Sequence, residues 1–160
     1  QRQMCIRDSF IRTFLYIINP RLTKTYRNLE HYGNPEKILS DVEKQIRRRI
    51  LLQTKTLILT PRYLVELSDD ICAIIPLPEV LWIYDHAAMR RTIKGRQLSY
   101  TIHVVTMKGE EYTLTGKSHR EVSAIYHELN TRYPNFFFGY SKEHQEMVQY
   151  VLHEMKNEKA

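Results

Sequence analysis

The stretch YTIHVVTMKGEEYTLTGKSHREVSAIYHELNTRY, residues 100–133, decides the fold that the sequence predicts. β-branched and aromatic residues dominate its first part, which is typical of strands, and Lys108-Gly109 turns the chain back into a second strand. Ser118 and Glu121 then have the spacing of a capping box, in which both side chains accept hydrogen bonds from backbone N–H groups at a helix start. We therefore expect an antiparallel hairpin followed directly by an amphipathic helix over residues 118–132.

The region upstream of this stretch also shows the two-residue period of strands, from about residue 50 onward. Pro61-Arg62 separates two apolar runs as a tight turn, and Pro76-Leu77-Pro78 interrupts the ladder because proline cannot donate a backbone hydrogen bond. The sequence is polar over residues 85–97, and we expect a loop there. The expected strands are residues 56–60, 63–67, 71–75, 80–84, 98–107 and 111–115.

Helices are expected on both sides of this strand-rich region. Asn34 supplies an N-cap and Pro35 takes the first helical position, where its missing N–H costs nothing. The helix that follows is expected to run to about Ile46 and to end in Arg47-Arg48-Arg49. The other expected elements are a short basic helix within residues 21–33, an apolar link at residues 136–140 and a last helix after Ser141.

A small, twisted antiparallel sheet must close or be covered, because open strand edges invite aggregation. The predicted fold is therefore α+β. It is an antiparallel β-barrel or strongly bent sheet of six to seven strands, plugged by the helix at 118–132, with an N-terminal helix and an extra C-terminal helix. The chain then divides into a first segment with its helix, the strand domain, and a C-terminal link and helix, at residues 10–47, 48–133 and 134–160.

Four segments carry a resemblance to a known family: LILTPRYLVEL (57–67), IIPLPEVLWIY (74–84), YTIHVVTMKGEEYTL (100–114) and REVSAIYHELNTRYPNFFFGYS (120–141). Over about residues 19–155 the chain resembles a bacterial pleckstrin-homology-like (PH-like) domain. In that group of uncharacterised proteins, a membrane-spanning N-terminal part leads through Asn-Pro and a basic segment into the barrel. The resemblance implies a PH-like fold on the cytoplasmic side of the membrane, and it brings no catalytic signature and no site residues.

The first nine residues are expected to have a separate origin, and the residues that follow them are expected to connect the domain to a membrane. Residues 3–9 read back codon by codon as the transposase end sequence used in DNA library preparation, so we interpret residues 1–9 as a translated adapter scar. Without its two arginines and one aspartate, the formal charge falls from +6 to +5. Phe14–Ile18 is apolar and is followed by Asn19-Pro20 and basic residues, which is typical of the cytoplasmic end of a membrane helix. The alternative is a short amphipathic turn packed on the domain.

Two basic clusters are the candidate binding residues. Arg90, Arg91, Lys94 and Arg96 in the expected loop could receive phosphate head groups, or they could belong to a solvated loop. Arg47, Arg48 and Arg49 either stabilise the end of their helix through its dipole or face a phosphate or lipid.

Catalytic and cofactor-binding sites need certain residue types at fixed spacings. The sequence contains no HxxxH, GxGxxG, GxxxxGK or GxSxG pattern. With Cys5 discounted, Cys72 is the only cysteine, and its apolar setting predicts a buried, inert thiol in a reducing compartment. We therefore expect no catalytic residues, no cofactor and no metal. A further alternative is an enzyme whose site is assembled from dispersed residues.

The leading hypothesis is a non-catalytic binding or scaffolding module at the cytoplasmic membrane face, held by an N-terminal anchor, and otherwise a cytoplasmic protein. A protein partner or self-association through the last helix is compatible with it. The alternative is a weak nucleic-acid-binding protein in which Arg47–Arg49 and Arg90–Arg96 form one stripe. The modest charge and the lack of a recognition-helix or RNP-type motif weigh against nucleic acid.

Overall fold

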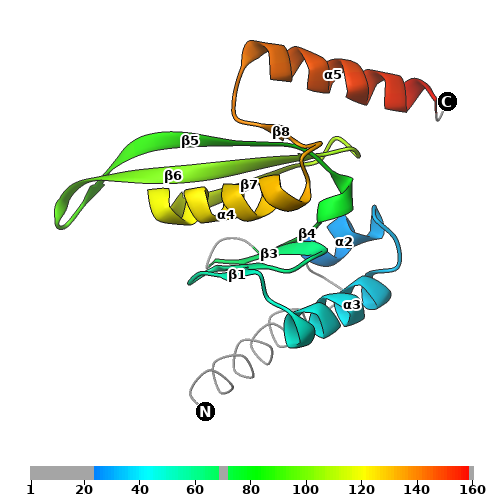
Figure 1. Ribbon diagram of the computed structural model, residues 1–160, viewed down its shortest axis with the longest axis horizontal. Helices are drawn as coiled ribbons and strands as arrows, with labels where there is room; N and C mark the ends of the chain where they lie inside the picture. Colours follow the sequence, from blue (N-terminus) through cyan, green and yellow to red (C-terminus); the bar gives the residue numbers. More distant parts are fainter. Residues whose placement is uncertain (1–23, 69–71, 159–160) are drawn as a thin grey trace. The chain divides into compact units, whose positions relative to one another are not determined.

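The computed structural model describes residues 24–68 and 72–158, and it has an α+β fold with two four-stranded sheets (Figure 1). The chain separates into two compact units, residues 1–77 (unit 1) and 78–160 (unit 2). The α+β class predicted from the sequence is confirmed. The boundary between the units falls inside the segment 48–133 that we expected to form one strand domain. The expectations for residues 1–9 and for Phe14–Ile18 lie outside the described residues.

Unit 1 combines two helices with an antiparallel sheet in the order β1-β2-β3-β4. Its elements are α2 (Lys24–Glu30), α3 (Pro35–Arg48), β1 (Leu52–Gln53), β2 (Leu57–Leu59), β3 (Tyr63–Leu67) and β4 (Cys72–Pro76). The helix start predicted at Asn34 is confirmed, because its side-chain oxygen accepts hydrogen bonds from the backbone N–H groups of Glu36 and Lys37. Pro76 ends β4, and the single turn η1 (Leu77–Glu79) follows.

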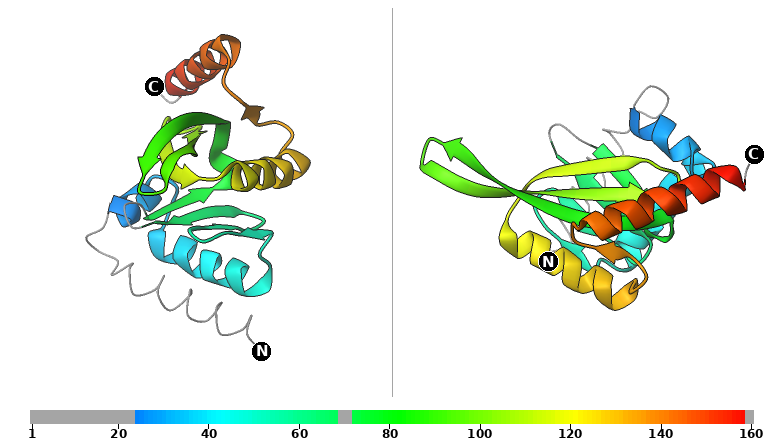
Figure 2. Two further views of the ribbon diagram at one scale, coloured as in Figure 1. Left: turned by 90° about the vertical axis from the view of Figure 1, so that its left-hand side faces the viewer. Right: turned by 90° about the horizontal axis from the view of Figure 1, so that it is seen from above.

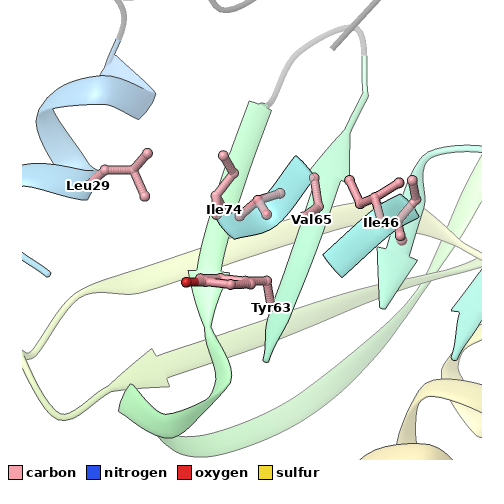
Figure 3. Packing of buried hydrophobic residues seen from close by; sticks show 7 residues of the cluster. Leu29, Ile46, Tyr63, Val65 and Ile74 are labelled. Atoms are coloured by element: carbon pink, nitrogen blue, oxygen red, sulfur yellow. The ribbon is translucent and has the colours of Figure 1, made fainter. Parts of the chain in front are cut away.

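The two helices of unit 1 bury their apolar sides against the sheet. Figure 3 shows Leu29 of α2 and Ile46 of α3 beside Val65 and Ile74 of the strands, and all four are at most 2% exposed. Removing this apolar surface from water is the main term that holds the unit together. Tyr63 adds a polar tie, because its hydroxyl donates to Asp41 Oδ2 of α3 at 2.8 Å.

Unit 2 is a second four-stranded sheet, ordered β7-β6-β5-β8, with one helix on each side. Its elements are β5 (Val80–Thr92), β6 (Gly95–Thr106), β7 (Glu111–Lys117), α4 (His119–Arg132), β8 (Phe137–Phe138) and α5 (Lys142–Asn157). The capping box predicted at the start of α4 is confirmed: Ser118 Oγ accepts from the Glu121 N–H, and the Glu121 carboxylate accepts from the Ser118 N–H at 2.8 Å. Ser141 caps α5 as predicted.

The helices of unit 2 cover opposite faces of its sheet, as Figure 1 shows. On one face, Tyr126 of α4 donates its hydroxyl to Asp85 Oδ1 of β5 at 2.9 Å. On the other face, Val148 of α5 packs with Trp82 and Val105. The Trp82 indole N–H also donates to the Gly139 carbonyl at 2.9 Å, which ties β5 to the segment that leads into α5.

Three expectations about the strands were wrong. The polar segment 85–97 is not a loop, because it continues β5 and β6 as a long hairpin that turns only at Ile93-Lys94. The apolar link at 136–140 contains β8, which joins β5 in parallel through Trp82 and Ile83. The described strands number eight rather than six or seven, and within residues 24–68 and 72–158 they form two sheets and no closed barrel. Backbone pairing decides all three points, and exposed residues on both faces of a strand hide its two-residue period.

Candidate functional site

The outer half of the β5–β6 hairpin, residues 86–99, pairs with no other described strand of unit 2, and we call it the ribbon. Its cross-strand register runs without a break from His86 opposite Thr101 to Thr92 opposite Gly95. Every side chain from His86 to Leu98 is exposed. Among the described strands, β7 pairs only with the inner part of β6, and β8 only with the start of β5. The views in Figures 1 and 2 show the ribbon extending beyond the end of α4.

Four cations gather on this ribbon, and they are the residues predicted from the sequence: Arg90, Arg91, Lys94 and Arg96. No aspartate or glutamate occurs between Asp85 and Glu110 in the chain. Within the described part of the molecule, none of the four cations forms an ion pair. The ribbon is therefore a region of uncompensated positive charge.

The turn places two of these cations directly opposite each other. Arg91 is the cross-strand partner of Arg96, and like charges in such a pair destabilise an antiparallel ladder. The two-residue turn closes at Gly95, whose φ of +112° suits glycine, and the Thr92 hydroxyl donates to the Gly95 carbonyl at 3.0 Å. A multivalent anion between the two guanidinium groups would remove their repulsion and would accept charge-assisted hydrogen bonds from both.

The second predicted cluster lies in unit 1 and is differently placed. Arg47 and Arg48 occupy the last turn of α3, and Arg49 is its C-cap. Arg47 donates to Glu43 Oε1, one helical turn earlier, with the shorter contact at 2.7 Å. This arrangement fits the helix-stabilising interpretation of the cluster. The structure thus brings Arg90, Arg91, Lys94 and Arg96 together in one element and holds Arg47–Arg49 in the other unit.

An aromatic cluster on the α5 side of the sheet was missed by the sequence reasoning. The Tyr84 ring stacks on His103 at 4.6 Å between centroids, and Trp82 lies 4.3 Å from Tyr84. Glu111 Oε1 accepts from the Tyr84 hydroxyl at 3.1 Å and lies 2.9 Å from His103 Nδ1. Burial, and then the hydrogen bond and charge of Glu111, raise the pKa of Tyr84 to about 12. The stacked rings and the two contacts of Glu111 tie β5, β6 and β7 together on this face of the sheet.

Trp82 and Tyr84 are two residues apart in one strand, so the sequence alone predicts that they share a face of the sheet. Only the strand register shows that His103 and Glu111 lie on that same face.

Cys72 at the start of β4 is partly buried rather than fully buried. Burial raises the pKa of its thiol, so the thiolate form is disfavoured at neutral pH. In the described ranges, no group of three or more His, Cys, Asp or Glu side chains is placed to hold a metal ion. None of the helices within residues 24–68 and 72–158 combines the length and the apolar character that crossing a membrane requires.

Comparison with known families places the chain in one of them. Residues 34–148 match the family described as Domain of unknown function (DUF6709). The chain belongs to this family. The match begins at the N-cap of α3 and ends within α5, so it includes both sheets and the whole ribbon. No curated protein and no solved structure matches the chain.

Proposed function

We propose that this member of the DUF6709 family is a non-catalytic binding module of PH-like architecture that docks on an anionic membrane surface at the cytoplasmic face of the cell membrane. The observation that carries the proposal is the ribbon, with four exposed cations, no acidic residue within it and Arg91 opposite Arg96. The PH-like part rests on the antiparallel strands and on the capped helix that directly follows β7.

The size of the electrostatic attraction indicates how such a module would work. Each cation near an anionic bilayer surface contributes about 1 kcal/mol, so the four ribbon cations together contribute about 4 kcal/mol. That corresponds to a dissociation constant of about 1 mM, which is weak for a free protein. A second attachment, such as the membrane anchor expected at the N-terminus, would raise the local concentration enough for the contact to form. The ribbon would then orient a protein that is already held at the membrane.

The same cations could contact the phosphates of a nucleic acid, but the ribbon lacks the aromatic side chains on which bases stack. Proteins that bind single strands stack bases on aromatic side chains. Residues 86–99 contain no phenylalanine, tyrosine or tryptophan, and their large apolar side chains are those of Met89, Ile93 and Leu98. These aliphatic side chains suit a lipid surface better than a base.

Vesicle binding tests the proposal directly. The double variant Arg91→Gln/Arg96→Gln removes two ribbon cations, and Lys142→Gln/Lys156→Gln removes two exposed cations from α5 as a matched control. On vesicles with 30% phosphatidylserine, the ribbon variant should bind about thirtyfold more weakly than the wild type, because two cations account for about 2 kcal/mol. The control should bind like the wild type, and vesicles of pure phosphatidylcholine should not discriminate among the three proteins.

Equal losses in the two variants would mean that only net charge matters, and the ribbon would not be the site. Tighter binding to single-stranded RNA than to the anionic vesicles, lost in the ribbon variant alone, would replace the membrane proposal by the nucleic-acid alternative.

A further inference from the structure

The ribbon exposes apolar side chains together with its cations. Six large hydrophobic side chains are exposed in the described residues, and three of them belong to the ribbon. Ile93 at the turn is completely exposed, Met89 is 65% exposed and Leu98 is 48% exposed. Single exposed hydrophobic residues are common on protein surfaces, but three within one hairpin end are a local concentration that needs a reason.

Two of these side chains continue the core face of the sheet. Met89 lies directly opposite Leu98, and alternation along β5 puts Met89 on the same face as Asp85, which accepts the hydrogen bond from α4. α4 covers this face closer to the core, and the face continues beyond the N-terminal end of that helix. At this end of α4, the ring centroids of Tyr100 and His119 lie 5.6 Å apart. The opposite face of the ribbon is polar, with Ala88 opposite Ser99, Arg90 opposite Gln97 and Thr92 opposite Gly95.

We infer that this end of the ribbon inserts into the interfacial region of an anionic lipid bilayer, with the Met89–Leu98 pair and the turn residue Ile93 among the upper acyl chains. The inference rests on the proposed function and deepens it, because it names the bilayer itself, rather than a soluble phosphate, as the ligand. Arg91 and Arg96 lie on the same face, between the Met89–Leu98 pair and the turn. Their long side chains can run along the interface and reach headgroup phosphates while their apolar stems stay buried.

The dimensions of the ribbon favour an orientation that lies flat on the membrane. The four residue steps from Met89 to Ile93 span about 13 Å at the rise of an extended chain. Interfacial elements bury their apolar face only about 5–10 Å into the boundary between headgroups and acyl chains. A ribbon inserted tip first would leave Met89 and Leu98 in the headgroup layer, whereas a flat ribbon brings the Met89–Leu98 pair to the depth of the acyl-chain boundary.

The charge of the ribbon favours an anionic bilayer over a second copy of the chain as the occupant. A second copy of the ribbon would bring four more cations against the first four, and this repulsion opposes self-association through the face. An anionic bilayer offers negatively charged headgroups next to an apolar phase. The cations of the ribbon complement the headgroups, and its apolar side chains complement the acyl chains. A bare two-stranded ribbon is only marginally stable in water, so docking would also order it.

Tryptophan placed on each face of the ribbon tests the inference. Leu98→Trp reports on the face of the Met89–Leu98 pair, Ile93→Trp reports on the turn, and Gln97→Trp reports on the opposite, polar face. Met147→Trp on α5 is a control at another exposed hydrophobic position. The native Trp82 is 5% exposed and supplies a constant background. With anionic vesicles that contain brominated acyl chains, Ile93→Trp and Leu98→Trp should be quenched and blue-shifted, and Gln97→Trp and Met147→Trp should not.

A binding measurement gives the size of the effect. Ile93→Ser should reduce partitioning into anionic vesicles at least tenfold, because the substitution removes most of the apolar surface that insertion of this side chain would take out of water. That reduction should persist at 1 M salt, where electrostatic attraction is screened within about 3 Å. Met147→Ser should bind like the wild type.

The outcomes distinguish the inference from the proposed function. Binding to anionic vesicles without quenching of Ile93→Trp or Leu98→Trp overturns the inference and leaves electrostatic docking intact. Equal quenching of Gln97→Trp and Leu98→Trp also overturns it, because the ribbon would then have no inserted face. A blue shift that appears without vesicles and grows with protein concentration would identify a second copy as the occupant. No binding of the wild type to anionic vesicles would overturn both.

Discussion

The pair formed by Arg91 and Arg96 predicts that one substitution will stabilise the ribbon and weaken its binding. The two residues are direct cross-strand partners, so Arg91→Glu replaces a repulsive pair with an attractive one. At about 6 Å in water, each interaction amounts to roughly 0.7 kcal/mol. The change from repulsion to attraction should therefore make local opening of the ribbon about 1.4 kcal/mol more costly. The same substitution changes the ribbon charge by two units, which should weaken binding to anionic vesicles by about 2 kcal/mol, or thirtyfold.

Amide hydrogen exchange measures the first effect, because protection reports the free energy of local opening. In low salt, amides around Ala88–Arg90 and Gln97–Ser99 should exchange about tenfold more slowly in Arg91→Glu than in the wild type. The difference should shrink at 1 M salt, where the interaction is screened. Lys94→Glu is the matched control, since Lys94 lies in the turn without a cross-strand partner, and it makes the same change in charge. Unchanged protection in Arg91→Glu, or an equal gain in Lys94→Glu, would refute the reasoning.

Three further predictions concern the scaffold of the two units. Ile46→Ala should destabilise unit 1 by about 2–4 kcal/mol, since Ile46 is 1% exposed in its core, and urea unfolding followed by circular dichroism should show a lower midpoint. Ser118→Ala should cost about 1 kcal/mol through loss of the capping box, while Ser118→Asp, which preserves an N-cap acceptor, should melt close to the wild type. Burial, together with the hydrogen bond to Asp41, raises the pKa of Tyr63 from 10.0 to about 12. Its protonated form is favoured in the folded state, so this stabilisation is complete below pH 10 and is lost as the pH rises to 12. Urea midpoints should fall across that window, and they should fall less in Tyr63→Phe.

Local signals in the sequence were sufficient for the helices and for most strands. The N-caps at Asn34 and Ser118 were readable because capping depends on residues within one turn of each other. The strands at 63–67 and 111–115 were recognised because β-branched and aromatic residues gather there. The sequence also indicates the four cations of the ribbon as candidates, but it predicts a loop there, because exposed polar residues on both faces carry no periodic signal.

Tertiary structure alone decided how these elements pair. Placing Arg91 opposite Arg96 and Met89 opposite Leu98 requires a register, and a shift of one residue would put different side chains on each face. The division of the strands into two sheets and the pairing of β8 with β5 depend on contacts between residues far apart in the chain. Such contacts form only when their packing outweighs the loss of chain entropy, and no short stretch of sequence contains that balance.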